Sequence, residues 1–149
     1  MENYVLWTLL HQTSDAMLRA WQKELNLIGI TTEQAAALFV IQAIQGPATP
    51  AEISRWLFRQ PHTVFGLLNR MEKDGLVTQT KDLERKNLVR VALTPKGRQC
   101  YDASTKREVI SRIFSFLSKE QRRMLASYLE VLRNKALEEL TIKRKLSFS

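Results

Sequence analysis

The sequence predicts a mostly α-helical protein with one small β-hairpin set among the helices. Apolar residues recur at helical spacing along most of the 149 residues, and 44% of the chain is hydrophobic, which is enough for a packed core. Alternating apolar and polar residues, the pattern of a strand, are confined to residues 76–93. Threonine, serine, glycine and proline separate the helical stretches, as expected at helix ends.

The amino-terminal part of the chain predicts two helices. Helical spacing of apolar residues spans about residues 3–28, and Gly29 is suited to ending that helix in the left-handed conformation. Thr31 and Gln34 have the spacing of a capping box, in which each side chain accepts a hydrogen bond from the other residue's backbone N–H. The second helix should end near Gln45, and it should be buried because its centre is apolar on every side.

A pair of short helices joined by a tight turn comes next. Thr49 as the cap and Pro50 at the first helical position predict the start of the shorter helix. Gln60 and Pro61 predict the start of the longer one, which Gly75 closes. The inner face of the longer helix is an apolar stripe of Val64, Leu67, Leu68 and Met71.

The rest of the chain predicts a hairpin and two more helices. Residues 76–80 and 89–93 have the pattern of strands, and the polar residues between them predict the hairpin loop. Thr94 caps a helix that we expect to continue to about Leu117. A capping box at Ser118 predicts the start of the last helix.

The composition excludes several classes of protein. One cysteine and two histidines without metal-ligand spacing argue against a disulfide framework and a metal centre. The chain has no Ser-His-Asp order and no phosphate-binding glycine loop, so we expect neither an enzyme nor a bound cofactor. The lack of a membrane-spanning apolar run and of a signal-peptide pattern predicts a cytoplasmic protein without a membrane partner. The net charge of +8 favours a polyanionic partner.

Two short helices followed by a hairpin describe a winged helix-turn-helix, which is a unit that binds double-stranded DNA. Its second helix, the recognition helix, is expected to enter the major groove, and the hairpin loop, or wing, is expected to reach phosphates or the minor groove. Phe65 either touches a thymine methyl group or packs into the core, and the sequence leaves both open. The expected DNA-binding residues are Thr49, Gln60, His62, Thr63, Phe65, Gly66, Asn69, Arg70, Arg85 and Lys86.

Four stretches of the chain carry a resemblance to a known family. They are residues 25–38 (LNLIGITTEQAAAL), 51–57 (AEISRWL), 63–77 (TVFGLLNRMEKDGLV) and 91–97 (VALTPKG). In this order they resemble the MarR family (multiple-antibiotic-resistance regulators). The recognition helix departs from the family pattern at Phe65-Gly66, where a polar or basic pair is usual. The wing departs from it at Asn87, where arginine is common.

The resemblance implies a homodimeric repressor that binds a palindromic operator and responds to a small phenolic or otherwise lipophilic anion. The long apolar stripes of the terminal helices also need a partner, which a second copy provides. Trp7, His11 and Trp21 on the first helix are the candidate effector-binding residues. An aromatic stripe at helical spacing is, however, more often plain core or a dimer interface.

Four regions follow from this interpretation. Residues 1–46 are expected to support the fold and the dimer, 47–93 to bind DNA, 94–140 to dimerise, and 141–149 to form a basic flexible tail. The rival function is a winged-helix protein-interaction module without sequence-specific DNA binding. Gly66 on the reading face keeps that alternative open.

Overall fold

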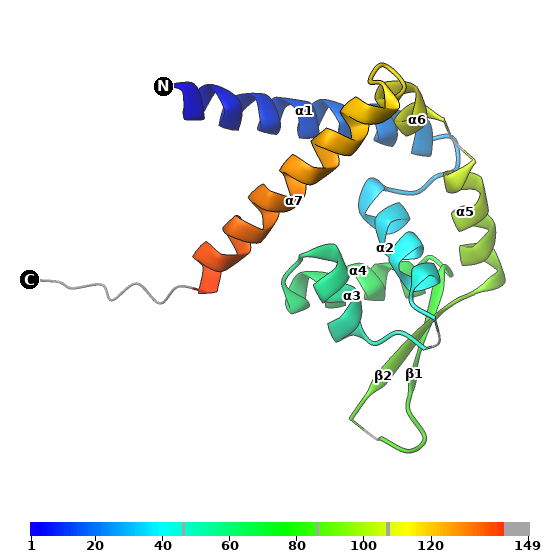
Figure 1. The fold of residues 1–149 in the computed structure, drawn as a ribbon. Coiled ribbons are helices and arrows are strands. Elements are labelled where there is room, and N and C mark those ends of the chain that lie inside the picture. Colours follow the sequence, from blue (N-terminus) through cyan, green and yellow to red (C-terminus); the bar gives the residue numbers. More distant parts are fainter. Residues whose placement is uncertain (46, 86, 107, 142–149) are drawn as a thin grey trace, which may run out of the picture. The chain divides into compact units, whose positions relative to one another are not determined.

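The computed structural model describes residues 1–45, 47–85, 87–106 and 108–141. It confirms the predicted fold class, because the described chain is mostly helical with a single antiparallel hairpin (Figure 1). Contacts divide the chain into two compact units, residues 1–110 and the residues from 111 onward. The elements in order are α1 (Glu2–Leu25), α2 (Thr32–Ala43), α3 (Pro50–Leu57), α4 (Pro61–Lys73), β1 (Val77–Lys81), β2 (Val89–Leu93), α5 (Pro95–Thr105), α6 (Val109–Phe114) and α7 (Lys119–Thr141).

Helix α2 is the centre of the first unit, and it packs against α1, α3, α4, α5 and β2. The core around it consists of large apolar side chains that are fully buried, including Leu25, Leu38, Ile53, Leu68 and Val91. The expectation that α2 is buried on every side is wrong at Phe39, which is 55% exposed. Packing on several sides of one helix therefore joins the elements of the unit into one core.

The helix starts follow the capping residues that the sequence predicts. The Thr31 hydroxyl accepts the backbone N–H of Gln34, and the Gln34 side chain accepts the N–H of Thr31, each at 3.1 Å. Thr49 and Thr94 cap α3 and α5 in the same way, through their hydroxyl oxygens. Gly29 ends the first helical segment with a φ of +76°, as expected for a left-handed stop. Local sequence is therefore enough to place these boundaries.

The single long helix predicted after the hairpin is wrong, because the chain forms α5 and α6 instead. Near the end of α5, the hydroxyls of Ser104 and Thr105 both donate to the backbone carbonyl of Tyr101. Such bonds offer the backbone an alternative to the helical ladder. The backbone N–H of Val109 then donates to a carboxylate oxygen of Glu24 at 3.1 Å, so a side chain of α1 satisfies the start of α6.

Strands β1 and β2 pair antiparallel, and Val77 lies opposite Leu93 at the base of the hairpin. An isolated bridge joins Ala48 to Val91, whose N–H donates to the Ala48 carbonyl at 2.7 Å. The base of the hairpin packs against α2, α3 and α4, while the loop projects beyond the helices (Figure 1). Among the described helices, none is both long and apolar enough to span a membrane.

Gly97 and Gly66 provide a matched pair of glycine variants. A Cβ atom at Gly97 would lie 2.0 Å from the backbone oxygen of Leu76, so we expect Gly97→Ala to destabilise the fold by about 3 kcal/mol. A Cβ atom at Gly66 would meet only the Nη1 atom of Arg70, at 3.5 Å. Gly66→Ala should therefore stabilise the fold by up to about 1 kcal/mol, through helix propensity. Urea unfolding of both variants checks the pair, and a similar midpoint for the two would contradict the close approach at Gly97.

Candidate nucleic-acid interface

The turn between α3 and α4 is stabilised by a hydrogen bond from a buried side chain. Ser54 is buried, and its hydroxyl donates to the backbone carbonyl of Arg59 at 2.6 Å. Phe58, which ends α3, has a φ of +53°, a left-handed conformation that is unusual for a residue with a side chain. The chain can thereby reverse direction within a few residues, so that α4 starts at Pro61 and packs against α3.

Helix α4 has one buried and one exposed face. The predicted apolar stripe is fully or nearly fully buried, which fixes the rotation of the helix about its axis. Phe65 is 48% exposed, so it lies on the outer face and not in the core. Gly66 is partly buried within the same face. The other predicted DNA-binding side chains of this helix are also exposed, namely His62, Thr63, Asn69 and Arg70.

Hydrogen bonds connect the outer face of α4 to the hairpin. The Gln79 side chain donates from Nε2 to Oδ1 of Asn69 at 3.0 Å. The backbone N–H of Gln79 donates to Oε2 of Glu72 at 2.7 Å. The sequence analysis missed Gln79 and Glu72, since nothing in the local sequence of a strand indicates which helix it lies beside.

The carboxyl end of α4 is held by both α2 and α5. Gln34 of α2 is buried and donates from Nε2 to Oδ2 of Asp74 at 3.1 Å. From the start of α5, Lys96 donates to the backbone carbonyl of Asp74 at 2.8 Å, and Thr94 donates to the carbonyl of Gly75 at 2.5 Å. The bonds from Lys96 and Thr94 satisfy backbone carbonyl groups that the end of a helix leaves without partners, and all three bonds hold α4 in place.

The wing is anchored by Asp82, which is buried. Its Oδ1 atom accepts the backbone N–H groups of Glu84 at 2.8 Å and Arg85 at 3.3 Å. Its Oδ2 atom accepts Nε of Arg90 at 2.7 Å and lies 2.6 Å from Nη2 of the same guanidinium. These bonds, first the one from the Glu84 backbone and then the one from Arg90, hold the pKa of the Asp82 carboxyl below its usual value.

The remaining predicted DNA-binding residues are distributed between the wing and the helix starts. The Arg85 side chain is exposed in the loop after β1, whereas Lys86 lies outside the described residues. Thr49 is partly buried, and its hydroxyl oxygen accepts the N–H of Glu52 at 3.2 Å. Gln60 is exposed at the cap position of α4, where its side chain makes no capping bond.

The predicted effector residues do not converge on one site within the described chain. The rings of Trp7 and His11 are in contact on α1, with centroids 4.8 Å apart, and Trp7 is 62% exposed. Trp21 instead packs against the core of the first unit. It lies 14 residues after Trp7 on the same helix, which is roughly 21 Å along the helix axis at 1.5 Å per residue.

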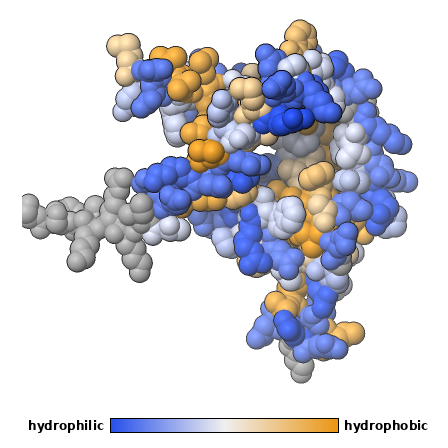
Figure 2. Space-filling view, viewed as in Figure 1, coloured by the Kyte–Doolittle hydropathy of each residue, from blue (hydrophilic) through white to orange (hydrophobic). Residues whose placement is uncertain are grey.

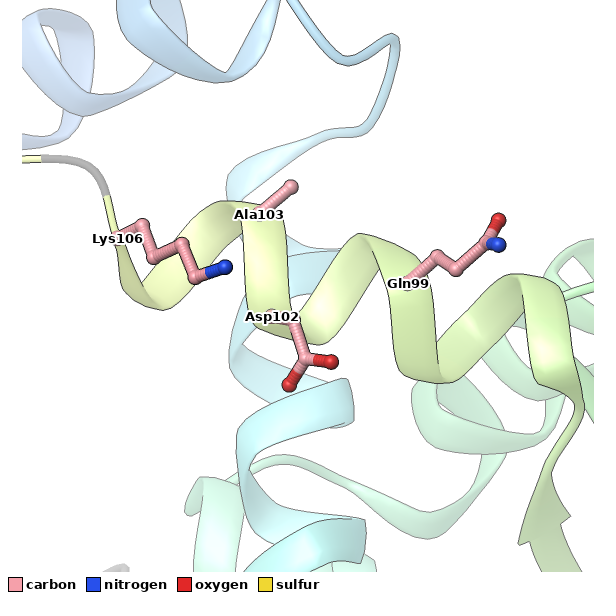
Figure 3. A pocket seen from close by; sticks show the side chains of 4 residues that line it. All are labelled: Gln99, Asp102, Ala103 and Lys106. Atoms are coloured by element: carbon pink, nitrogen blue, oxygen red, sulfur yellow. The ribbon is translucent and has the colours of Figure 1, made fainter.

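Two surface cavities lie elsewhere. In one, of about 520 Å³, the lining among the described residues is Gln99, Asp102 and Ala103 of α5 and Lys106 just after it (Figure 3). The other, of about 540 Å³, lies between the end of α2, the hairpin and α5. Trp7, His11 and Trp21 line neither cavity. Within the described ranges, no cluster of His, Cys, Asp and Glu side chains is suited to a metal ion.

Apolar side chains are exposed on both terminal helices. Figure 2 shows hydrophobic residues gathered on the amino-terminal half of α1. Those at least 44% exposed there are Tyr4, Val5, Leu6, Trp7, Leu9 and Leu10. On α7 the corresponding residues include Tyr128, Val131, Leu132 and Leu140. Apolar stretches of this length are rarely left in water by soluble proteins.

Comparison with known proteins identifies the family. A model described as MarR family matches residues 28–86, which include α3, α4 and the start of the wing. The ligand-free organohalide-sensing RdhR-CbdbA1625 transcriptional regulator is 31% identical, with a TM-score of 0.86 over 100% of this chain and 90% of that chain. The chain belongs to the MarR family. Its winged helix is therefore the DNA-binding unit of a MarR family transcription regulator.

Two further solved structures show the same fold. The same RdhR-CbdbA1625 regulator in the 2,4-dichlorophenol bound form has a TM-score of 0.87 and 29% identity, over 100% of this MarR family chain and 92% of that chain. A mutant MarR from E. coli, complexed with operator DNA, has a TM-score of 0.80 and 21% identity, over 88% of this chain and 95% of that chain. A search of curated protein sequences found no match.

The anchoring of the wing by Asp82 makes a pH-dependent prediction. The pKa of Asp82 is lowered in the folded state, so the stabilisation is complete above the ordinary carboxyl pKa of about 3.9 and is lost as the pH falls through the lowered value. Asp82→Asn should therefore reduce the hydrogen-exchange protection of the Glu84 and Arg85 amides near neutral pH. The wild type should lose the same protection only in acid. Glu84→Gln, a change at the exposed neighbouring acid, is the control, and equal loss in both variants would contradict the anchoring role.

Proposed function

We propose that the chain is a non-enzymatic, cytoplasmic repressor that binds a palindromic operator as a homodimer and is released by a small phenolic or lipophilic effector. The observation that carries this proposal is the outer face of α4, where the polar side chains of His62, Thr63, Asn69 and Arg70 are exposed while the opposite stripe is buried. A helix presented in this way, next to a hairpin with an exposed arginine, has the arrangement of a reading helix and a wing. Family membership supports the same interpretation.

The homodimer is proposed because the terminal helices expose long apolar stripes. A second copy of the chain would cover them with the same surface, as a two-fold dimer does. Under this proposal residues 1–46 and 94–140 form the dimer and residues 47–93 bind DNA. Two recognition helices related by a two-fold axis would then meet successive major grooves, which requires two half-sites in inverted orientation.

The effector class is proposed from the relative and from α1. The RdhR-CbdbA1625 regulator has been solved with 2,4-dichlorophenol, and its ligand-bound form is 29% identical to this chain. On α1 the exposed Trp7 and His11 offer an apolar ring surface and a hydrogen-bonding ring nitrogen side by side. A chlorophenol needs these two types of contact. The ligand would shift the population of DNA-binding dimers only through unequal affinity for two arrangements of the recognition helices.

The dimer is tested by sedimentation equilibrium. At micromolar concentration we expect a species of about twice 17.3 kDa. Leu10→Glu places a charge in the exposed apolar stretch of α1 and should shift the equilibrium toward monomer, whereas Thr78→Glu, at an exposed position of β1 outside the terminal helices, should not. A wild-type monomer over this concentration range would contradict the proposal.

The roles of wing and helix are separated by titrating an operator and a random duplex at two salt concentrations. Arg85→Ala should weaken binding to both duplexes alike. The slope of log affinity against log salt concentration should become shallower by about one unit for each lost phosphate contact. Arg70→Ala should instead reduce the difference in binding free energy between operator and random duplex, by about 1–3 kcal/mol if a base contact is lost. If Arg85→Ala instead removed the discrimination between the duplexes and Arg70→Ala weakened both alike, the wing would read the bases and α4 would contact phosphates. If the wild type binds no duplex even at low salt, the protein-interaction alternative is favoured.

The effector is tested with 2,4-dichlorophenol as the probe. It should lower the affinity of the wild type for the operator, as followed by the anisotropy of a labelled duplex. Trp7→Ala and His11→Ala should each raise the chlorophenol concentration needed for half release, and sedimentation equilibrium checks that each variant is still a dimer. Operator affinity that does not change up to millimolar chlorophenol would contradict a phenolic effector and leave the DNA-binding proposal intact.

A further inference from the structure

The outer face of α4 has a glycine at its centre. His62, Gly66, Asn69 and Lys73 follow one another at intervals of three or four residues, so they form one stripe opposite the buried face. Within the helix, Gly66 does not serve packing, because a Cβ atom there would meet only the end of the Arg70 side chain. A glycine inside a helix costs about 1 kcal/mol relative to alanine. Its advantage therefore lies outside the protein, where a ligand can approach the helix backbone closely.

Gly66 leaves a notch in this face, and the Asn69 amide beside it is oriented by a hydrogen bond with Gln79. An asparagine amide has one oxygen that accepts hydrogen bonds and one nitrogen that donates two. The oxygen of Asn69 accepts Nε2 of Gln79 at 3.0 Å. The backbone of Gln79 is held in place, because it lies in β1 and its N–H donates to Glu72. With the Asn69 oxygen taken up by Gln79, the NH₂ group of Asn69 is the part of the amide that remains for a ligand.

Arg70 adds more donors on the other side of the notch. Its Nη1 atom would lie 3.5 Å from a Cβ atom at Gly66, so the guanidinium lies next to the glycine. A guanidinium has five N–H donors and no acceptor. The centre of the recognition helix thus presents donors from both Asn69 and Arg70. His62 and Thr63, which have groups of both kinds, lie in the first turn of α4.

Base edges in the major groove differ in their hydrogen-bonding groups. Guanine presents two acceptors, N7 and O6, whereas adenine presents an acceptor and an amino donor, and cytosine presents an amino donor. Two neighbouring protein donors fit the guanine edge. Facing adenine or cytosine, at least one of these donors would meet an amino group and would be left without an acceptor, which is costly in a water-poor interface.

We infer that α4 reads a guanine in each operator half-site, through the Asn69 NH₂ group and the Arg70 guanidinium, above the notch at Gly66. Gln79 is a positioning residue in this arrangement, because it acts on the base only through Asn69. The inference rests on the proposed binding of duplex DNA. It adds which base is contacted and that the protein supplies the hydrogen-bond donors.

The first part of the test identifies the base. Wild-type protein is used to select duplexes from a random pool, and each guanine of the enriched half-site is replaced in turn by 7-deazaguanine, which lacks the N7 acceptor. We expect one position at which this replacement lowers affinity about tenfold. At the same position guanine should be preferred over adenine by about the same factor.

The second part of the test uses two variants of Gln79. In Gln79→Glu the side chain can only accept, so the Asn69 NH₂ group should turn toward it and the Asn69 oxygen should face the groove. The preference for guanine should then fall about tenfold relative to adenine or cytosine, which offer an amino group. Gln79→Met has a similar length but neither donor nor acceptor, and it should weaken the preference without creating a new one.

Two controls separate this role from a structural one. Thermal unfolding checks that both variants fold, and a random duplex measured in parallel corrects for the added charge of Gln79→Glu. A guanine preference that is the same in wild type, Gln79→Glu and Gln79→Met overturns the role of Gln79. An enriched site that tolerates 7-deazaguanine at every position overturns the guanine contact while the proposed function stands. Failure of the wild type to enrich any duplex overturns both.

Discussion

The recognition surface depends on how the carboxyl end of α4 is fixed. At Asp74 and Gly75, side chains from α2 and α5 meet the end of the helix, and the donors are Gln34, Thr94 and Lys96. All three donors take part in the start of a helix: Gln34 belongs to the capping box of α2, and Thr94 and Lys96 lie at the cap and in the first turn of α5. The same residues that begin α2 and α5 therefore also fix the position of α4.

Close packing reinforces this junction. Gly97, in the first turn of α5, lies against the backbone carbonyl of Leu76, which directly precedes β1. No side chain fits between the two segments, so a shift of α5 toward the hairpin would cause a clash and a shift away would lose the contact. Interiors packed to this density transmit displacements. A change in α5 would thus reach both the base of the wing and the end of the recognition helix.

The sequence predicts the parts of this structure that neighbouring residues decide. The helix starts at Thr31, Thr49 and Thr94 were predictable because a capping residue acts on a backbone N–H only two or three positions away. The exposure of the outer face of α4 was predictable from its period. The DNA-contacting roles of the individual side chains remain predictions.

The parts that the sequence does not predict are contacts between distant segments. The helix break before Val109 involves Glu24 of α1, and the orientation of Asn69 involves Gln79 of β1. The partner of Asp82 in the wing, Arg90, is eight residues away on the opposite strand. Spacing along the chain contains no information on such pairs, because they form only when separate elements pack together.

The bonds of Asp82 have a consequence for the thermodynamics of association. One carboxylate oxygen receives the backbone of the turn and the other receives the opposite strand, so this part of the loop is ordered before any ligand arrives. Association usually costs entropy when loops and side chains become immobilised at an interface. Here most of that loss for residues 82–85 is incurred during folding. The wing should consequently engage a polyanion with little change in its own shape and a small entropic penalty.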